Sequence, residues 1–189
     1  MRLIGKTFLT ALLLACSVWL SIGASGQEVV NSSAGKTAVE ESSRAAPNFA
    51  LPDLRGKQVG SADLKDNVII LDFWATWCEP CISEIPIFNT IQQEYASRGV
   101  KVIGVAVQSG WPRDVRRFVT KHKMRYTILV GNDDIVSGFE VIAFPTTYII
   151  APGWKIHKKY SGAYEKKSAE LERDIEALLQ SIDEKKGVR

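Results

Sequence analysis

Two apolar segments mark the centre of the predicted fold. Residues 68–74 form an apolar run that only Asp72 interrupts, and residues 100–107 form a second, largely apolar run. Such runs are typical of parallel strands that are covered on both faces. A third strand is expected over residues 126–130. We therefore predict a sheet whose core strands run parallel.

Helices are predicted between these strands and after them, because apolar residues recur there at every third or fourth position. The predicted helices cover residues 81–98, 112–122 and 165–182, with a short helical segment near residues 135–139. Gly99 ends the first helix and Pro112 opens the second.

Two hairpins complete the predicted elements. Residues 49–54 and 58–59 flank a turn that contains Gly56, and residues 146–150 and 155–160 flank a turn at residues 151–154. The order of elements predicts an α/β fold with a mixed central sheet, helices on both faces and an N-terminal β-hairpin.

The first 26 residues are typical of an export segment. Arg2 and Lys6 are basic, residues 8–20 are mostly apolar, and small residues follow. Residues 3–22 are also long enough to cross a membrane, so residues 1–26 are a signal peptide or a membrane anchor. A lipid-modified Cys16 is a further alternative. Each of these readings predicts an extracytoplasmic protein, in the periplasm or on the outer face of the inner membrane.

The remaining chain divides by composition. Residues 27–46 lack apolar periodicity and are rich in Ser, Ala and Glu, which indicates a disordered linker. We expect a single folded domain over residues 47–182 and a short C-terminal tail over residues 183–189.

Charge argues against a nucleic-acid partner. The formal net charge is +3, and residues 1–26 contain two basic residues and no acid, so the chain without them carries +1. This balance is no signature of nucleic-acid binding. Basic residues do gather on one predicted helix, where a solvated face is the simpler interpretation: Arg113, Arg116, Arg117, Lys121 and Lys123.

Cys78 and Cys81 carry the candidate chemistry. They are separated by two residues, at the point where the predicted central strand gives way to a helix. A helix N-terminus stabilises a thiolate, so Cys78 is the expected nucleophile and Cys81 the resolving thiol, with Pro80 keeping the closure rigid. One such pair, with His122 and His157 on other elements, offers too few ligands for zinc, and no metal is expected.

Several motifs together resemble the thioredoxin superfamily, and most closely its TlpA/ResA-like extracytoplasmic branch. They are Phe73-Trp-Ala-Thr-Trp-Cys-Glu-Pro-Cys81, Phe144-Pro-Thr-Thr147 before a strand, and the opening Pro47-Asn-Phe-Ala-Leu-Pro-Asp53. The resemblance covers roughly residues 47–182. It implies a thioredoxin fold and a protein-disulfide reductase, or thiol–disulfide oxidoreductase, that needs no cofactor and acts on protein thiols and disulfides.

The resemblance also implies roles for residues around the cysteine pair. Pro145 should be a cis-proline facing the disulfide, with Phe144, Thr146 and Trp77 contacting the substrate. Asp72 should be a buried carboxylate that assists deprotonation of Cys81, although many envelope relatives have Asn there. The alternative for Asp72 is a solvent-facing position at a strand end. Those relatives also often carry a Glu after the second strand, where this chain has Gln108 and Ser109.

The direction of electron flow is a separate question. Glu79, beside Cys78, disfavours a thiolate and so favours a reductant. The resemblance suggests reduction of envelope proteins, for example apocytochrome c, with a membrane thiol carrier as electron donor. An oxidase or isomerase role is the runner-up. A thiol peroxidase is less favoured, because Ala75 and Leu71 replace the Thr and Pro it needs. A binding module merely braced by the disulfide is another alternative.

Overall fold

A five-stranded sheet lies at the centre of the part of the chain that the computed structural model describes, residues 44–187. The strand order is β5-β4-β3-β6-β7. Three of these strands are parallel: β3 (Val68–Trp74), β4 (Val100–Ala106) and β5 (Thr127–Val130). The other two are antiparallel to their neighbours: β6 (Thr146–Ala151) pairs with β3, and β7 (Lys155–Ser161) pairs with β6. The predicted mixed sheet is therefore confirmed.

The predicted N-terminal hairpin forms a separate two-stranded sheet. Its strands are β1 (Ala50–Pro52) and β2 (Gln58–Gly60), and a 3₁₀-helix, η1 (Ser61–Asp63), follows. The turn is closed by Asp53, whose carboxylate accepts hydrogen bonds from the N–H groups of Arg55 and Lys57.

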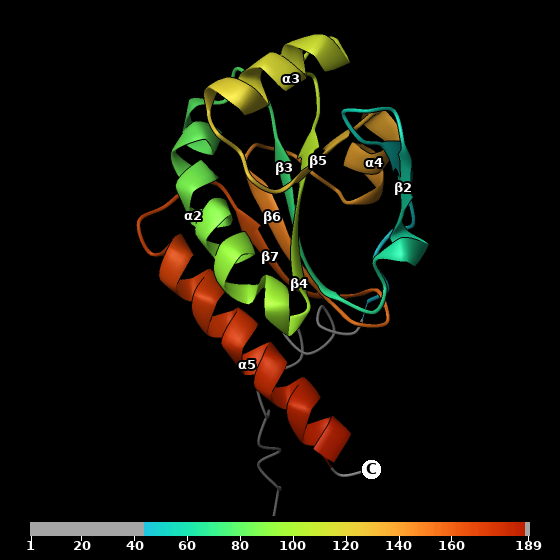
Figure 1. The fold of residues 1–189 in the computed structure, drawn as a ribbon, viewed down its shortest axis with the longest axis vertical. Helices are drawn as coiled ribbons and strands as arrows, with labels where there is room; N and C mark the ends of the chain where they lie inside the picture. Colours follow the sequence, from blue (N-terminus) through green and yellow to red (C-terminus); the bar gives the residue numbers. More distant parts are fainter. Residues whose placement is uncertain (1–43, 188–189) are drawn as a thin grey trace, which may run out of the picture. The chain divides into compact units, whose positions relative to one another are not determined.

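Helices cover both faces of the sheet (Figure 1). One face carries α2 (Glu79–Tyr95), continued by the 3₁₀-helix η2 (Ala96–Arg98), together with α3 (Pro112–Lys121) and α5 (Lys167–Gly187). The other face carries the short helix α4 (Asp133–Gly138) and the β1–β2 hairpin. Each layer buries its own apolar cluster against the sheet, so the sheet is buried on both sides as the apolar runs predicted.

The side chains of strand β3 point alternately into the two layers. Ile69, Leu71 and Phe73 pack with α4 and the hairpin. Val68, Ile70 and Trp74 point the other way, towards α2, α3 and α5. Side chains alternate along a strand, so Asp72 belongs to the α2 face. This is the face on which the cysteine pair lies.

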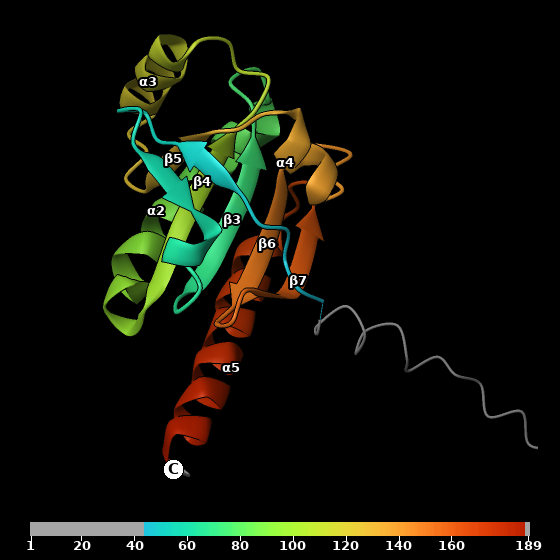
Figure 2. The same ribbon diagram turned by 90° about the vertical axis from the view of Figure 1, so that its right-hand side faces the viewer.

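Both predicted ends of the folded domain need correction. Contacts begin before Pro47: the Ala46 N–H donates to the Trp154 carbonyl, and the Ile156 N–H donates to the Arg44 carbonyl. This segment therefore lies beside the start of β7 (Figure 2). At the other end, α5 begins two residues later than expected and continues through residues 183–187, because no helix-breaking residue precedes Gly187.

The remaining expectations about the termini fall on residues 1–43 and 188–189, outside the described part. They concern the signal peptide or anchor, Cys16 and most of the predicted linker. Within residues 44–187, no helix combines the length and the apolar character that crossing a membrane requires.

Candidate active site

The cysteine pair sits where the sequence places it, between β3 and α2. Cys78 is the N-cap of α2, and its extended backbone lets the Sγ atom accept a hydrogen bond from the Cys81 N–H at 3.3 Å. Pro80 occupies the first turn of the helix, where a missing N–H leaves no bond unmade. Cys78 and Cys81 are joined in a disulfide. The predicted redox pair is thus assembled at a helix N-terminus.

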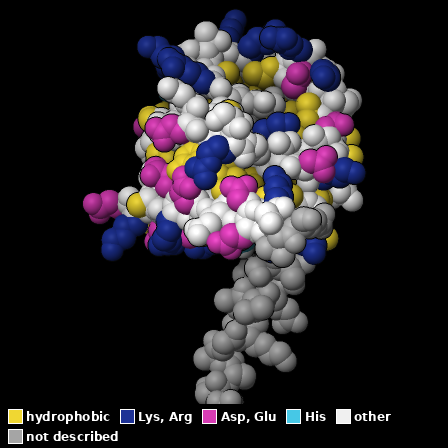
Figure 3. Space-filling model, turned by 60° about the horizontal axis from the view of Figure 1, so that its bottom comes forward, with side chains coloured by type: hydrophobic (Ala, Val, Ile, Leu, Met, Phe, Trp, Pro, Cys, Tyr) yellow, Lys and Arg dark blue, Asp and Glu magenta, His cyan; other side chains and the backbone are white. Residues whose placement is uncertain are grey.

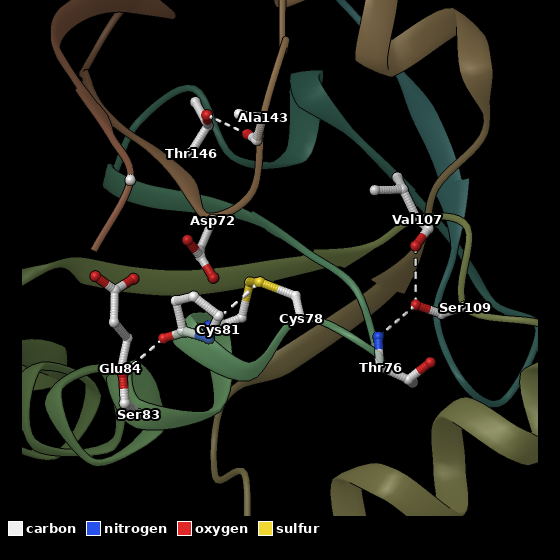
Figure 4. Close-up of a disulfide and its surroundings, with 12 residues drawn as sticks. Asp72, Thr76, Cys78, Cys81, Ser83, Glu84, Val107, Ser109, Ala143 and Thr146 are labelled. Atoms are coloured by element: carbon white, nitrogen blue, oxygen red, sulfur yellow. Dashed lines mark hydrogen bonds between the residues drawn. A yellow bond between two sulfur atoms is a disulfide. The ribbon is translucent and has the colours of Figure 1, made fainter.

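The two cysteine residues are buried to the same extent, since each is 5% exposed. In their polar surroundings, Cys78 receives the capping N–H bond, and the carboxyl group of Asp72 points towards the disulfide (Figure 4).

Asp72 is buried, so the alternative of a solvent-facing side chain is wrong. The residue is 2% exposed, and its Oδ1 accepts a hydrogen bond from Thr147 Oγ1 at 2.8 Å. Burial raises the pKa of Asp72 from its ordinary 3.8 to about 8, outweighing the opposing effects of Lys167 and Thr147. A carboxyl group with such a pKa exchanges a proton near neutral pH, which suits it to proton transfer with a thiol.

The segment before β6 contains the predicted cis peptide, between Phe144 and Pro145. Phe144 meets the ring of Trp77 edge to face, with 5.8 Å between ring centroids. Trp77 is 63% exposed, so these two aromatic rings form an apolar surface beside the disulfide that a substrate can reach. Trp77 is held in place because its Nε1 donates to the Gln108 carbonyl at 3.0 Å.

Thr146 does not fit its predicted substrate-binding role. Its side chain is buried, and its Oγ1 donates to the Ala143 carbonyl at 2.7 Å. The hydroxyl thus closes the turn that carries Pro145 instead of facing a substrate.

The other two predicted positions lie at the surface. Glu79 and Pro80 are both exposed in the first turn of α2. The Pro80 carbonyl accepts a hydrogen bond from Ser83 Oγ at 2.7 Å, which ties this turn to the next. Glu79 is therefore a solvated charge beside the sulfurs, not a buried catalytic group.

Sequence analysis missed the support that Ser109 gives. Its Oγ accepts a hydrogen bond from the Thr76 N–H at 3.0 Å and donates to the Val107 carbonyl at 2.8 Å. The loop after β4 thereby holds the turn that precedes Cys78. Its small hydroxyl thus bonds to backbone groups.

Glu84 and Lys167 are a second pair that the sequence did not reveal. They form an ion pair with 2.8 Å between Oε2 and Nζ, and their side chains are only 4% and 1% exposed. Glu84 lies three positions after Cys81, a spacing that places both on one side of α2 and was available as a signal. Nothing local points to Lys167, which is 83 residues away in the chain.

Charge elsewhere on the surface is mixed. Acidic and basic side chains alternate over the lower half of the face in Figure 3, whereas basic side chains gather along its upper edge. The basic residues of the α3 region are exposed to solvent: Arg113, Arg116, Arg117, Lys121 and Lys123. Among residues 44–187, no group of three or more His, Cys, Asp or Glu side chains is arranged to hold a metal ion.

Comparison with known proteins agrees with this geometry. The sequence model of the AhpC/TSA family matches residues 43–159. Thiol-disulfide oxidoreductase ResA of Bacillus subtilis is 34% identical over 130 residues, which are 68% of this chain and 72% of that protein. Thioredoxin-like protein YneN of the same organism is 29% identical over 156 residues, or 82% of this chain and 92% of that protein.

Solved structures point the same way. A Chlorobium tepidum protein assigned as thiol:disulfide interchange protein DsbE superposes with a TM-score of 0.69 at 29% identity, covering 73% of this chain and 97% of that one. The chain therefore belongs to the AhpC/TSA family, has its thioredoxin-like fold, and is a thiol–disulfide oxidoreductase of the ResA/DsbE type.

Proposed function

We propose that this protein is a reductant for disulfide bonds in other proteins outside the cytoplasm. The observation that carries the direction is the carboxylate of Glu79, exposed in the first turn of α2 beside Cys78. A strongly oxidising disulfide is one whose reduced form is stabilised. Negative charge next to a sulfur disfavours the thiolate, so Glu79 makes the disulfide a weaker oxidant and the dithiol a better reductant.

The reaction proceeds by two exchanges. The Cys78 thiolate attacks a substrate disulfide, one S–S bond breaks, a mixed disulfide forms, and one substrate sulfur leaves as a thiolate. Cys81 then gives its proton to the Asp72 carboxylate and attacks the Cys78 sulfur. This second step forms the Cys78–Cys81 disulfide and releases the other substrate sulfur. Two electrons pass from the dithiol to the substrate, whose two thiolates take up protons.

Trp77, Phe144 and Pro145 are the proposed substrate contacts. The exposed ring of Trp77 and the half-buried ring of Phe144 lie beside the disulfide, and Pro145 follows in the same segment. An apolar surface of this kind binds a peptide with little side-chain ordering, because aromatic rings have few rotatable bonds.

Location and partners follow from the sequence pattern and the family resemblance. An export segment at residues 1–26 supports a position in the periplasm or on the outer face of the inner membrane. Apocytochrome c is the proposed substrate, and a membrane thiol carrier is the proposed electron donor.

One observation favours the second candidate, an oxidase or isomerase. The hydrogen bond from the Cys81 N–H to Cys78 Sγ, at the positive end of α2, favours a thiolate at Cys78 and thus a more oxidising disulfide. The two influences oppose each other, and the redox equilibrium with glutathione measures which is larger. A reductant stays largely oxidised until reduced glutathione is in great excess. Ready reduction by a modest excess of glutathione would refute the proposed direction.

Substrates can be identified by trapping. A Cys81→Ala variant cannot resolve its mixed disulfides, so partners should accumulate on Cys78 and be released by a thiol reductant. The Cys78→Ala variant is the matched control and should hold none. Equal yields from the two variants would contradict the assignment of Cys78 as the attacking thiol.

A further inference from the structure

A buried lysine acts electrostatically on Asp72 and has no role in the reaction as described so far. Lys167, in the first turn of α5, is 1% exposed and pairs with Glu84 of α2. Taking two charges out of water costs free energy that their attraction repays only in part, so a buried ion pair is weak evidence for a stabilising role. Its place in the molecule suggests another purpose.

Three ionisable side chains from three elements influence one another here. Asp72 comes from β3, Glu84 from α2 and Lys167 from α5, and both Glu84 and Lys167 act electrostatically on the Asp72 carboxyl group. Burial is the largest influence on the pKa of Asp72, Lys167 lowers it, and Glu84 raises it. In Figure 4 the carboxyl groups of Asp72 and Glu84 lie on the same side of the disulfide.

Lys167 is held in one position by two partners. Its Nζ donates to Glu84 Oε2 at 2.8 Å and to the Gly162 carbonyl at 3.1 Å. The Gly162 N–H in turn donates to the Pro145 carbonyl at 2.8 Å. The lysine thus connects the helix that carries Cys81 to the segment that carries the cis-proline.

Glu84 depends on this lysine for its charge. The other carboxylate oxygen, Oε1, is buried and has no hydrogen-bond partner among residues 44–187. Burial raises the pKa of Glu84, and the hydrogen bond and positive charge of Lys167 oppose that rise. Loss of the ammonium group would therefore leave a second buried acid without compensation beside Asp72.

We propose that Lys167 is a positioning residue for thiol–disulfide exchange, which fixes the Glu84 carboxylate and sets the charge balance that decides at which pH Asp72 accepts the proton of Cys81. The inference deepens the proposed reaction and rests on the proposed role of Asp72 as proton acceptor. With Lys167 and Glu84 both charged, Asp72 ionises next to an ion pair whose net charge is zero. Without the ammonium group it would have to ionise next to another anion.

The proposal predicts effects of opposite sign for the two partners. Removing the Lys167 charge should move ionisation of Asp72 to higher pH, and removing the Glu84 charge should move it to lower pH. The other titratable side chains that interact with these carboxyl groups are Tyr126, before β5, and Tyr164, before α5. Burial raises the pKa of both phenols, so both stay neutral through the relevant pH range.

The experiment separates the two cysteine steps in the reduced protein. One equivalent of dithiobis(nitrobenzoate) reacts first with Cys78, forming a mixed disulfide and releasing one thionitrobenzoate. Attack of Cys81 on the Cys78 sulfur then releases the second thionitrobenzoate. The two phases of release are measured by stopped flow as functions of pH. The first phase reports Cys78 and serves as an internal control, and the second reports deprotonation of Cys81.

In Lys167→Met, the second phase should slow near neutral pH, by about tenfold for each pH unit by which its midpoint rises. In Glu84→Gln the midpoint should fall. The first phase should change little in either variant. Lys158→Met is a matched control, because Lys158 also pairs with an acid on α5, Asp174, but is not among the groups that act on Asp72.

The double variant Glu84→Gln/Lys167→Met is a control for misfolding, because it buries no unpaired charge. If Lys167→Met alone does not fold, the double variant is compared with Glu84→Gln, from which it differs only at the lysine, and its midpoint should be the higher of the two. Unchanged midpoints, or shifts of the same sign for the lysine and the glutamate, would overturn the proposal.

A further variant keeps the two proposals distinguishable. Asp72→Asn should slow the second phase and abolish its pH dependence in this range. If it does not, the role of Asp72 in the proposed reaction fails. If it does while the lysine and glutamate variants leave the midpoint unmoved, only the inference about Lys167 fails.

Discussion

Replacing Asp72 by Asn should stabilise the oxidised protein, because the wild-type fold buries an acid that prefers water. The folded pKa is about 8 and the ordinary value is 3.8. Each pH unit between them is worth about 1.4 kcal/mol, so Asp72 disfavours the folded state by about 6 kcal/mol at high pH, where it ionises in the fold, and by about 4 kcal/mol at neutral pH, where only the unfolded side chain is ionised. Asn keeps the shape and can still accept the hydrogen bond from Thr147 Oγ1.

The sign of the pH dependence follows from proton binding. Between pH 3.8 and about 8, folded Asp72 retains its proton while the unfolded side chain has lost it. The folded state therefore binds more protons, and the free energy of unfolding falls as pH rises through this window. Below pH 3.8 Asp72 is protonated in both the folded and the unfolded state, so it adds no pH dependence. Above about pH 8 it is ionised in both states, and the free energy of unfolding falls no further. Asp72→Asn removes this slope.

Urea unfolding of the oxidised protein at several pH values between about 4 and 9 measures the effect. The wild type should lose several kcal/mol relative to Asp72→Asn across this range, a large fraction of the stability of an ordinary domain. Asp66→Asn, the same change at an exposed position, is the control and should follow the wild type. If wild type and Asp72→Asn lose stability in parallel, Asp72 is not a buried neutral acid and the reasoning fails.

Two further predictions concern the surface beside the disulfide and a second titrating acid. Trp77→Ala should lower the rate at which protein disulfides are reduced several-fold and leave the rate with a small aromatic disulfide nearly unchanged. The reason is that the exposed ring contacts only a larger substrate. Equal losses of rate with both substrates would contradict this role. Burial raises the pKa of Asp174, but hydrogen bonds from Lys158, Tyr160 and Arg173 outweigh it and hold the pKa at about 2. The stability that ionised Asp174 adds to the fold is present above pH 3.8 and lost as pH falls through about 2. Asp174→Asn should therefore be about 2 kcal/mol less stable than wild type at neutral pH. In urea unfolding it should also lose less stability than wild type on acidification.

Much of the fold was predictable, because the governing signals are local. The apolar run at residues 68–74 coincides with β3, and the cysteine pair falls at a helix start as its position after this run indicates. A buried Asp72 was expected through the family resemblance, with a solvent-facing side chain as the alternative, and the burial is confirmed. The cis peptide at Pro145 was expected only through the family resemblance, and it is confirmed.

The parts that could not be predicted depend on contacts distant in sequence or on the exact orientation of side chains. Lys167 looks like an ordinary helix residue until α5 is packed against α2, where Glu84 receives it. Thr146 sits next to the cis-proline, and only the register of β6 shows that its hydroxyl turns inwards. The end of α5 was placed too early because apolar periodicity stops at Ile182, although the charged residues beyond it favour helix equally well.

The cap on α2 bears on how easily the protein can cycle. The atom that accepts the Cys81 N–H bond is the Cys78 sulfur itself, and the bond is made while this sulfur is part of the disulfide. Gaining negative charge makes a sulfur a better acceptor. We therefore expect the cap to persist when the disulfide is reduced, so that turnover need not wait for a rearrangement of the helix.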